Sequence, residues 1–133
     1  MVQAIKVLLF DLGRVLVDFD HLRSAQRMAA FCSKTPRQIY DLFFESSATI
    51  AFEAGKITPE DFYLQVKQML DLKLSYVSFE PIWNDIFFLS VKNRSVFSLV
   101  NNLRANYKTA MLSNINILHY EYLKDNFLKV EGL

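Results

Sequence analysis

The sequence has few of the residues that define several classes of protein. It has one cysteine, Cys32, so no disulfide can form within the chain, a pattern typical of reducing compartments. No Cys and His cluster has zinc spacing, and the two histidines, His21 and His119, stand alone. The 15 Lys and Arg residues nearly balance 14 Asp and Glu residues, and the net charge is +1. This balance provides no field that would collect nucleic acid or an acidic membrane.

Long apolar runs are missing as well. The N-terminal apolar stretch is interrupted by Asp11, and neither a small-residue cleavage site nor a span of about 20 apolar residues follows it. These absences predict a soluble, cytoplasmic protein that has neither nucleic acid nor a membrane as a partner. With 133 residues, 52% hydrophobic and 22% charged, the chain is long enough to bury the core of about one globular domain.

Two short apolar segments have the pattern of buried strands, and each runs into polar residues. Lys6 to Phe10 precedes Asp11, and Thr109 to Leu112 precedes Ser113 and Asn114. A carboxylate at the end of a buried apolar strand lowers the folding stability by several kcal/mol unless a partner or a ligand pairs with its charge. Parallel α/β sheets bind ligands at the carboxyl ends of their strands, so the two strand ends together predict a site.

Most of the remaining sequence has helical patterns. Thr35 before Pro36 and Thr58 before Pro59 are N-cap and first-turn signals that predict the start of two helices. Pro81 is predicted to open a further helix in the same way. Helical periodicity also covers residues 21–32, 93–107 and 119–127.

The order of these elements predicts an α/β fold with a partial Rossmann-like parallel sheet. The stretch between the two strands is far longer than a crossover helix needs, so an inserted helical cap is expected. Residues 1–17 and 91–133 would form an incomplete core, and residues 18–90 the cap. His119 is predicted to be solvated. The predicted core of the cap consists of Trp83 and the phenylalanines at 43, 44, 62, 87 and 88.

These segments resemble the haloacid dehalogenase-like (HAD) hydrolases. "FDLGRVLVD" is similar to the first motif of that family, Asp-x-Asp after a strand, with Gly13 in place of the second aspartate. "AMLSN" is similar to the second motif, a strand that ends in Ser or Thr. "FEAGKITPEDF" and "LSNIN" are similar to segments of phosphatase-like members with a helical cap. The resemblance covers essentially the whole chain and implies a phosphatase acting on a small phosphorylated metabolite.

The resemblance also implies a role for each residue at the strand ends. Asp11 would attack phosphorus and form an aspartyl-phosphate, which divides hydrolysis into two displacements. Mg²⁺ would bind a carboxylate oxygen of Asp11 and the backbone carbonyl of Gly13, and would offset the repulsion between carboxylate and phosphate. Ser113, the second catalytic residue, would donate its hydroxyl to a phosphate oxygen. The implied substrate-binding residues are Leu12, Gly13, Arg14 and Asn114.

Two departures from the family pattern bear on activity. Gly13 has no side chain to carry a proton where phosphatases commonly have an acid. The lysine of the third motif and the acidic pair of the fourth would lie on later strands, yet only about twenty residues follow Ser113. We therefore expect a chain truncated after the second motif, which binds Mg²⁺ weakly and is inactive alone.

Each motif residue also has a plainer interpretation. Alone, Asp11 could cap a turn or a helix, Ser113 and Asn114 could be loop residues, and Arg14 could be an exposed turn arginine. The alternative function is a noncatalytic HAD-like module that binds phosphate or a partner without turnover. A receiver-like domain phosphorylated on aspartate is disfavoured by the long helical insert and by the lack of an early acidic pair.

The small number of predicted strands bears on how the chain assembles. Two strands alone would leave a strand edge and part of a helix face uncovered, and such surfaces recruit another chain. A homo-oligomer, or a chain held by a partner, with contacts at the sheet edge rather than through the cap, is therefore expected.

Overall fold

The computed structural model describes residues 4–133, which form two compact units. The first, here called the sheet unit, combines residues 4–19 with Phe87–Asn114 and Lys124–Leu133. The second, the helical unit, combines Asp20–Ile86 with Ile115–Leu123. The helical unit thus includes a segment that comes after the second predicted strand. The assignment of a HAD core and a cap to these parts of the chain stays a prediction.

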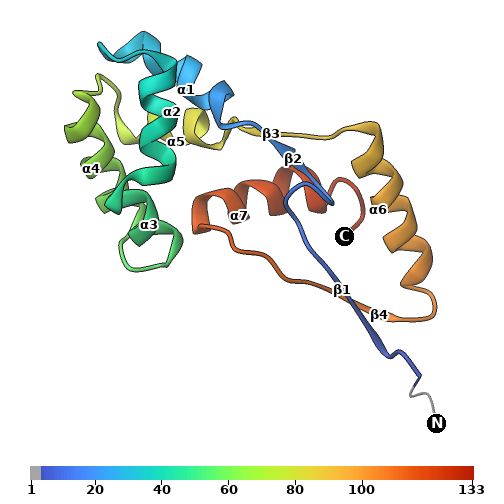
Figure 1. The fold of residues 1–133 in the computed structure, drawn as a ribbon. Helices are drawn as coiled ribbons and strands as arrows, with labels where there is room; N and C mark the ends of the chain where they lie inside the picture. Colours follow the sequence, from blue (N-terminus) through green and yellow to red (C-terminus); the bar gives the residue numbers. More distant parts are fainter. Residues whose placement is uncertain (1–3) are drawn as a thin grey trace. The chain divides into compact units, whose positions relative to one another are not determined.

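The sheet unit is organised by two short sheets (Figure 1). β1 (Val7–Phe10) pairs in parallel with β4 (Lys108–Met111), which confirms the predicted parallel pairing of the two strands. β2 (Asp18–Phe19) pairs antiparallel with β3 (Phe87–Phe88), and this second sheet was not predicted. The unit also contains α6 (Val91–Leu103) and the π-helical turn η2 (Lys124–Leu128).

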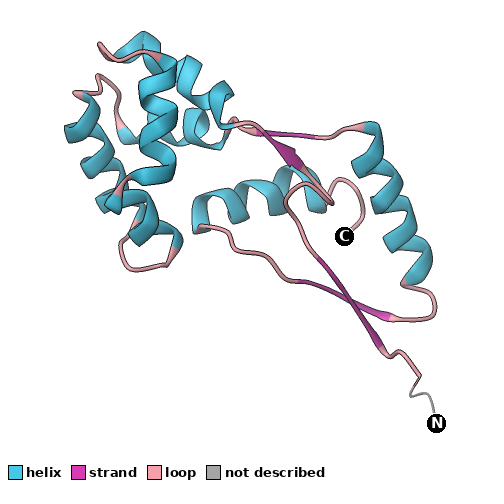
Figure 2. Cartoon of the chain, viewed as in Figure 1, coloured by secondary structure: helices cyan, strands magenta, loops and turns pink. Residues whose placement is uncertain are grey.

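The helical unit contains helices and loops (Figure 2). The two threonine and proline signals are confirmed, because the side chains of Thr35 and Thr58 accept hydrogen bonds from the backbone N–H groups of Gln38 and Asp61. The helices are α1 (His21–Met28), the 3-10 turn η1 (Ala29–Phe31), α2 (Pro36–Glu45), α3 (Ser47–Glu53), α4 (Pro59–Leu70), α5 (Tyr76–Asn84) and α7 (Ile117–Leu123).

The predicted helix start at Pro81 is wrong. Ser75 caps α5 by accepting a hydrogen bond from the backbone N–H of Ser78, so the helix begins at Tyr76 and Pro81 lies inside it. A proline inside a helix leaves the carbonyl four residues earlier without its usual donor. That residue is Val77, which is 80% exposed, so water can bond its carbonyl.

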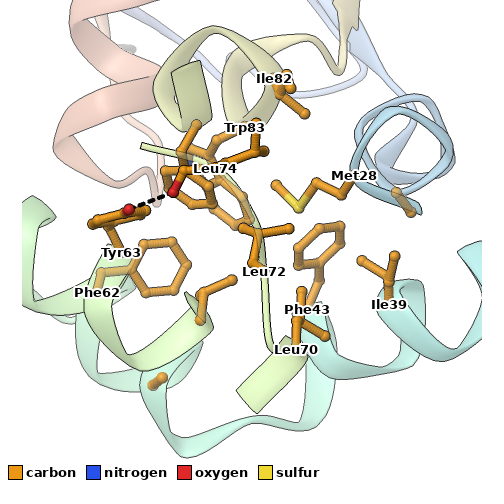
Figure 3. Packing of buried hydrophobic residues seen from close by; sticks show 14 of the residues in the cluster. Met28, Ile39, Phe43, Phe62, Tyr63, Leu70, Leu72, Leu74, Ile82 and Trp83 are labelled. Carbon is orange, nitrogen blue, oxygen red and sulfur yellow. Dashed lines mark hydrogen bonds between the residues drawn. The ribbon is translucent and has the colours of Figure 1, made fainter. Parts of the chain in front are cut away.

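Aromatic and aliphatic side chains together fill the core of the helical unit (Figure 3). Phe62 is fully buried, stacks on Phe52 with a centroid distance of 4.3 Å, and meets the ring of Trp83 edge-on at 4.9 Å. The hydroxyl of Tyr63 donates to the carbonyl of Leu74, so this buried polar group has a partner. The ring contacts hold helices α3, α4 and α5 together.

The predicted set of cap aromatics is correct in part. Phe43, Phe62 and Trp83 belong to the core of the helical unit, as predicted. Phe87 and Phe88 instead form β3 in the sheet unit, because the chain leaves the helical unit at Ile86. The predicted core residue Phe44 has a side chain outside the described part of the structure.

The prediction that His119 is solvated is wrong. The residue is only 6% exposed, and its ring stacks on Trp83 with a centroid distance of 4.9 Å. Asn116 donates from Nδ2 to the His119 Nδ1 at 3.0 Å, which leaves Nε2–H to donate to the Trp83 carbonyl at 3.3 Å. These partners come from the same helical turn and from another helix, and a lone histidine in the sequence gives no sign of them.

Candidate functional site

The polar residues that follow the two predicted strands lie at the same edge of the sheet. β1 and β4 run parallel and in register, and the N–H of Leu112 donates to the carbonyl of Phe10 at 2.9 Å, one residue beyond the strand. Asp11 therefore follows one strand at the edge where Ser113 follows the other. This is the end of a parallel sheet where ligands generally bind.

A tight turn follows Asp11. The N–H groups of Leu16 and Val17 donate to the carbonyl of Leu12 at 2.9 and 3.1 Å, and the N–H of Arg14 donates to the carbonyl of Val17 at 2.7 Å. Arg14 has a φ of 61°, in the left-handed region that few non-glycine residues adopt. The turn is therefore closed by its own main chain.

The predicted site residues differ in their exposure. Asp11 is exposed, and its Oδ1 accepts the N–H of Leu12 at 2.7 Å. Leu12 is buried, its N–H donates to Asp11 and its carbonyl accepts from the turn, so little of this residue is accessible and its predicted substrate contact stays a prediction. Ser113 is half-buried and Asn114 is exposed. The hydroxyl and amide donors predicted for phosphate are thus accessible, and their roles stay predictions.

Gly13 and Arg14 both lie against Phe19. A Cβ at Gly13 would approach the Phe19 ring to 3.1 Å, closer than most real Cβ contacts, so glycine suits this position. The guanidinium carbon of Arg14 lies 4.5 Å from the centroid of the same ring. Neither contact is visible in the pattern of the sequence.

Asn93 supports the turn from the first turn of α6, and sequence reasoning missed it. It is fully buried, and its Nδ2 donates to the carbonyl of Val15 at 3.1 Å and to Oδ1 of Asp18 at 3.4 Å. Its Oδ1 accepts the N–H of Ser90 at 2.8 Å. The Ser-x-x-Asn spacing resembles a capping box and could have located the start of α6, but not the contacts with the turn.

Comparison with known proteins relates this geometry to a family. No protein-family model matches the chain. The HAD family enzyme BT-2542 from Bacteroides thetaiotaomicron, solved with magnesium and inorganic phosphate, matches 92% of the chain with a TM-score of 0.76 and 27% identity. The chain has the fold of HAD family enzymes. A predicted HAD-like hydrolase from Porphyromonas gingivalis matches 86% of the chain with a TM-score of 0.69 and 23% identity, which supports the same fold.

The chain spans only part of these HAD structures. It covers 60% of the length of the BT-2542 chain and 53% of that of the Porphyromonas gingivalis protein. The α/β fold class predicted from the sequence, with its small parallel sheet, agrees with these neighbours.

The strand-end site offers few ligands for a metal ion. No three His, Cys, Asp or Glu side chains within residues 4–133 are grouped so that they could hold one. The carboxylate of Asp11 and the carbonyl of Gly13 remain as two oxygen donors. Mg²⁺ in proteins usually combines one or two carboxylates with several waters and substrate phosphates. These two donors therefore fit part of a magnesium site and do not complete one.

Between residues 4 and 133, no helix is both long and apolar enough to cross a membrane. The cytoplasmic location stays a prediction.

Proposed function

We propose that the chain is the nucleophile-bearing part of a cytoplasmic HAD-type phosphatase that acts on a small phosphorylated metabolite. The observation that carries this proposal is the parallel, in-register pairing of β1 and β4, after which Asp11 and Ser113 emerge at one edge. The HAD fold supports the proposal, as do the magnesium and inorganic phosphate bound to BT-2542.

In the proposed reaction, a carboxylate oxygen of Asp11 attacks phosphorus while the bond from phosphorus to the leaving oxygen breaks and that oxygen takes a proton from water. Water then attacks the aspartyl-phosphate, which releases inorganic phosphate and restores the carboxylate. The hydroxyl of Ser113 and the amide of Asn114 donate to the phosphate oxygens and stabilise their charge. Asp11 and the carbonyl of Gly13 would hold Mg²⁺, which when bound would neutralise charge between carboxylate and phosphate.

The small donor set favours a second candidate for the isolated chain. Two protein oxygens compete poorly with water for Mg²⁺, so we propose weak magnesium binding and little or no turnover by these 133 residues alone. The chain would then act as a HAD-like module that binds phosphate without hydrolysing its ester.

Substitution of Asp11 by asparagine tests where the phosphate binds. The amide keeps the Oδ1 that accepts the N–H of Leu12, so the turn is expected to fold normally. Without Mg²⁺, we expect inorganic phosphate to bind roughly fivefold more tightly to Asp11→Asn, because a pair of unit charges 4 Å apart in water interacts by about 1 kcal/mol. Any hydrolysis of 4-nitrophenyl phosphate by the unaltered chain should disappear in this variant. Calorimetry and release of nitrophenol measure the two effects.

Asp125→Asn is the matched control, because it removes an exposed carboxylate of the sheet unit that pairs with Lys129. Phosphate affinity in this control should stay within twofold of that of the unaltered chain. Equal affinities in Asp11→Asn and the unaltered chain would show that phosphate does not bind beside Asp11. Undiminished hydrolysis in Asp11→Asn would exclude this residue as the nucleophile.

The exposed apolar residues of the sheet suggest how the chain assembles. Leu9 on β1 is 66% exposed, and Leu112, directly after β4, is 71% exposed. We propose that these surfaces pair with a second copy, which makes the protein a homo-oligomer through its sheet edge. Leu9→Lys should therefore shift the particle mass in light scattering toward the monomer, whereas Leu99→Lys on α6 should not. A monomer at micromolar concentration, with cooperative unfolding and no binding of a hydrophobic dye, would contradict this proposal.

A further inference from the structure

The guanidinium of Arg14 differs from those of the other five arginines in its hydrogen-bond partners. It makes no ion pair and no hydrogen bond with the described residues 4–133, and the residue is exposed. An exposed guanidinium without a carboxylate partner keeps its planar set of donors for an anionic ligand. The other five bind carboxylates or carbonyls: Arg23 and Arg27 with Asp85, Arg37 with Asp41, Arg94 with Glu131, and Arg104 with the carbonyl of Gly132.

The Phe19 ring holds this guanidinium. The distance of 4.5 Å from the guanidinium carbon to the ring centroid is within the range of a cation–π interaction. Phe19 is itself fixed by its place in β2 and by an edge-on contact with Phe87, at a centroid distance of 6.4 Å and an interplanar angle of 69°. The ring is thus a fixed support for the cation.

The backbone of Arg14 is restrained as well. Its N–H donates to the carbonyl of Val17 at 2.7 Å, and its own carbonyl accepts a hydrogen bond from Nζ of Lys92 at 3.4 Å. A side chain at the neighbouring Gly13 would be crowded, because its Cβ would approach the Phe19 ring to 3.1 Å and the ring would have to shift. The turn therefore carries its cation at Arg14, whose backbone is held by Val17 and Lys92.

We infer that Arg14 binds the phosphate dianion beside Asp11 and that Phe19 is the residue that positions it. The inference rests on the proposed function, because it places a phosphomonoester at Asp11. A guanidinium can donate two parallel hydrogen bonds to phosphate oxygens, and it stays protonated at every physiological pH. It thus offsets the repulsion between carboxylate and phosphate without transferring a proton, a step for which Gly13 has no group.

Binding of inorganic phosphate to the 133-residue chain, followed by calorimetry or phosphorus NMR, tests this inference. Arg14→Asn suits the left-handed backbone and should weaken phosphate binding about tenfold or more, since it removes hydrogen bonds from a charged donor to phosphate. Phe19→Leu, which leaves Arg14 intact but removes its support, should weaken binding roughly twofold to fivefold. Phosphate affinity is the readout for both, and circular dichroism checks that each variant is folded.

Arg14→His separates contact with phosphate from a structural role. Histidine also tolerates the left-handed backbone, and its ordinary pKa of about 6.5 makes its charge depend on pH. The ratio of phosphate dissociation constants for Arg14→His and the unaltered chain should rise about fivefold or more between pH 5.5 and 8, as the imidazole loses its proton. The same ratio for Arg14→Asn should stay constant over this range. A residue that only stabilised the turn would not change phosphate affinity with the titration of its side chain.

Two control variants match these changes. Lys108→Gln removes a cation at the opposite end of β4, and Phe88→Leu shortens the neighbouring aromatic residue on β3; both should keep phosphate affinity within twofold. If Asp11→Asn alters phosphate affinity and the Arg14 variants do not, the inference fails while the proposed function stands. If neither position affects it, the bound phosphate is adventitious and both fail. An effect of Lys108→Gln equal to that of Arg14→Asn would show general attraction by charge and would also overturn the inference.

Discussion

Replacement of Phe62 by alanine is expected to lower the free energy of unfolding of the helical unit by about 3–5 kcal/mol. The side chain is fully buried, and its ring contacts those of Phe52, Phe79 and Trp83. Alanine would remove these contacts and leave a cavity among helices that are themselves held in place by neighbouring rings. Small domains are stable by only about 5–15 kcal/mol, so this loss is a large part of the total.

Urea unfolding followed by circular dichroism measures the effect of Phe62→Ala. Leu64→Ala is the control, because Leu64 lies two residues away on the same helix and is 58% exposed. We expect this control to lose less than about 1 kcal/mol, since an exposed side chain contributes little burial. A Phe62→Ala variant as stable as Leu64→Ala would show that the aromatic cluster does not hold the helical unit together.

The helical unit should also lose stability as the pH falls from 7 to 5, and His119 is the reason. Burial lowers the pKa of this imidazole from 6.5 to about 3; the hydrogen bond with the Trp83 carbonyl opposes the shift, and the nearby His21 adds to it. The unfolded chain therefore binds a proton near pH 6.5 that the folded chain does not accept until about pH 3. The stabilisation is complete above pH 6.5 and decreases as the pH falls toward 3.

The size of this effect follows from the separation of the two pKa values. At pH 5 the loss should be roughly 2 kcal/mol, since each pH unit below 6.5 costs about 1.36 kcal/mol until the folded state also binds the proton. Urea unfolding at pH 7, 6 and 5 measures it. His119→Phe keeps a ring that can stack on Trp83 and cannot titrate, so its stability should depend less steeply on pH. His21→Gln should keep most of the steep dependence. Equal slopes for His119→Phe and the unaltered chain would contradict this explanation.

The parts of the fold that were predictable from the sequence depend on local chemistry. Thr35 and Thr58 mark helix starts because the cap hydrogen bond is made within a few residues of the threonine. β1 and β4 stand out because short apolar segments end abruptly in polar residues, and a long helical connection between them favours parallel pairing. The positions of Asp11 and Ser113 at one edge follow from that pairing.

The parts that were missed depend on contacts between distant segments. β2 and β3 have two residues each, too few for a strand pattern, and they join residues far apart in the chain. In the sequence, Phe19 and Asn93 resemble ordinary core and cap residues. Only the structure shows their contacts with the turn after Asp11. Likewise His119 is buried because Trp83 and Asn116 satisfy its ring, which composition does not reveal.

The pairing of β1 with β4 has a consequence for synthesis of the protein. Val7 pairs with Lys108, so the first strand leaves the ribosome 101 residues ahead of its partner. At about 5–20 residues per second, that wait is roughly 5–20 s, far longer than the collapse of a small chain. The helical unit is also incomplete until Ile115–Leu123 has been made, because this segment brings His119 to Trp83. Residues 20–86 therefore emerge with the Trp83 surface uncovered, and both units acquire their last partners within the same short interval of translation.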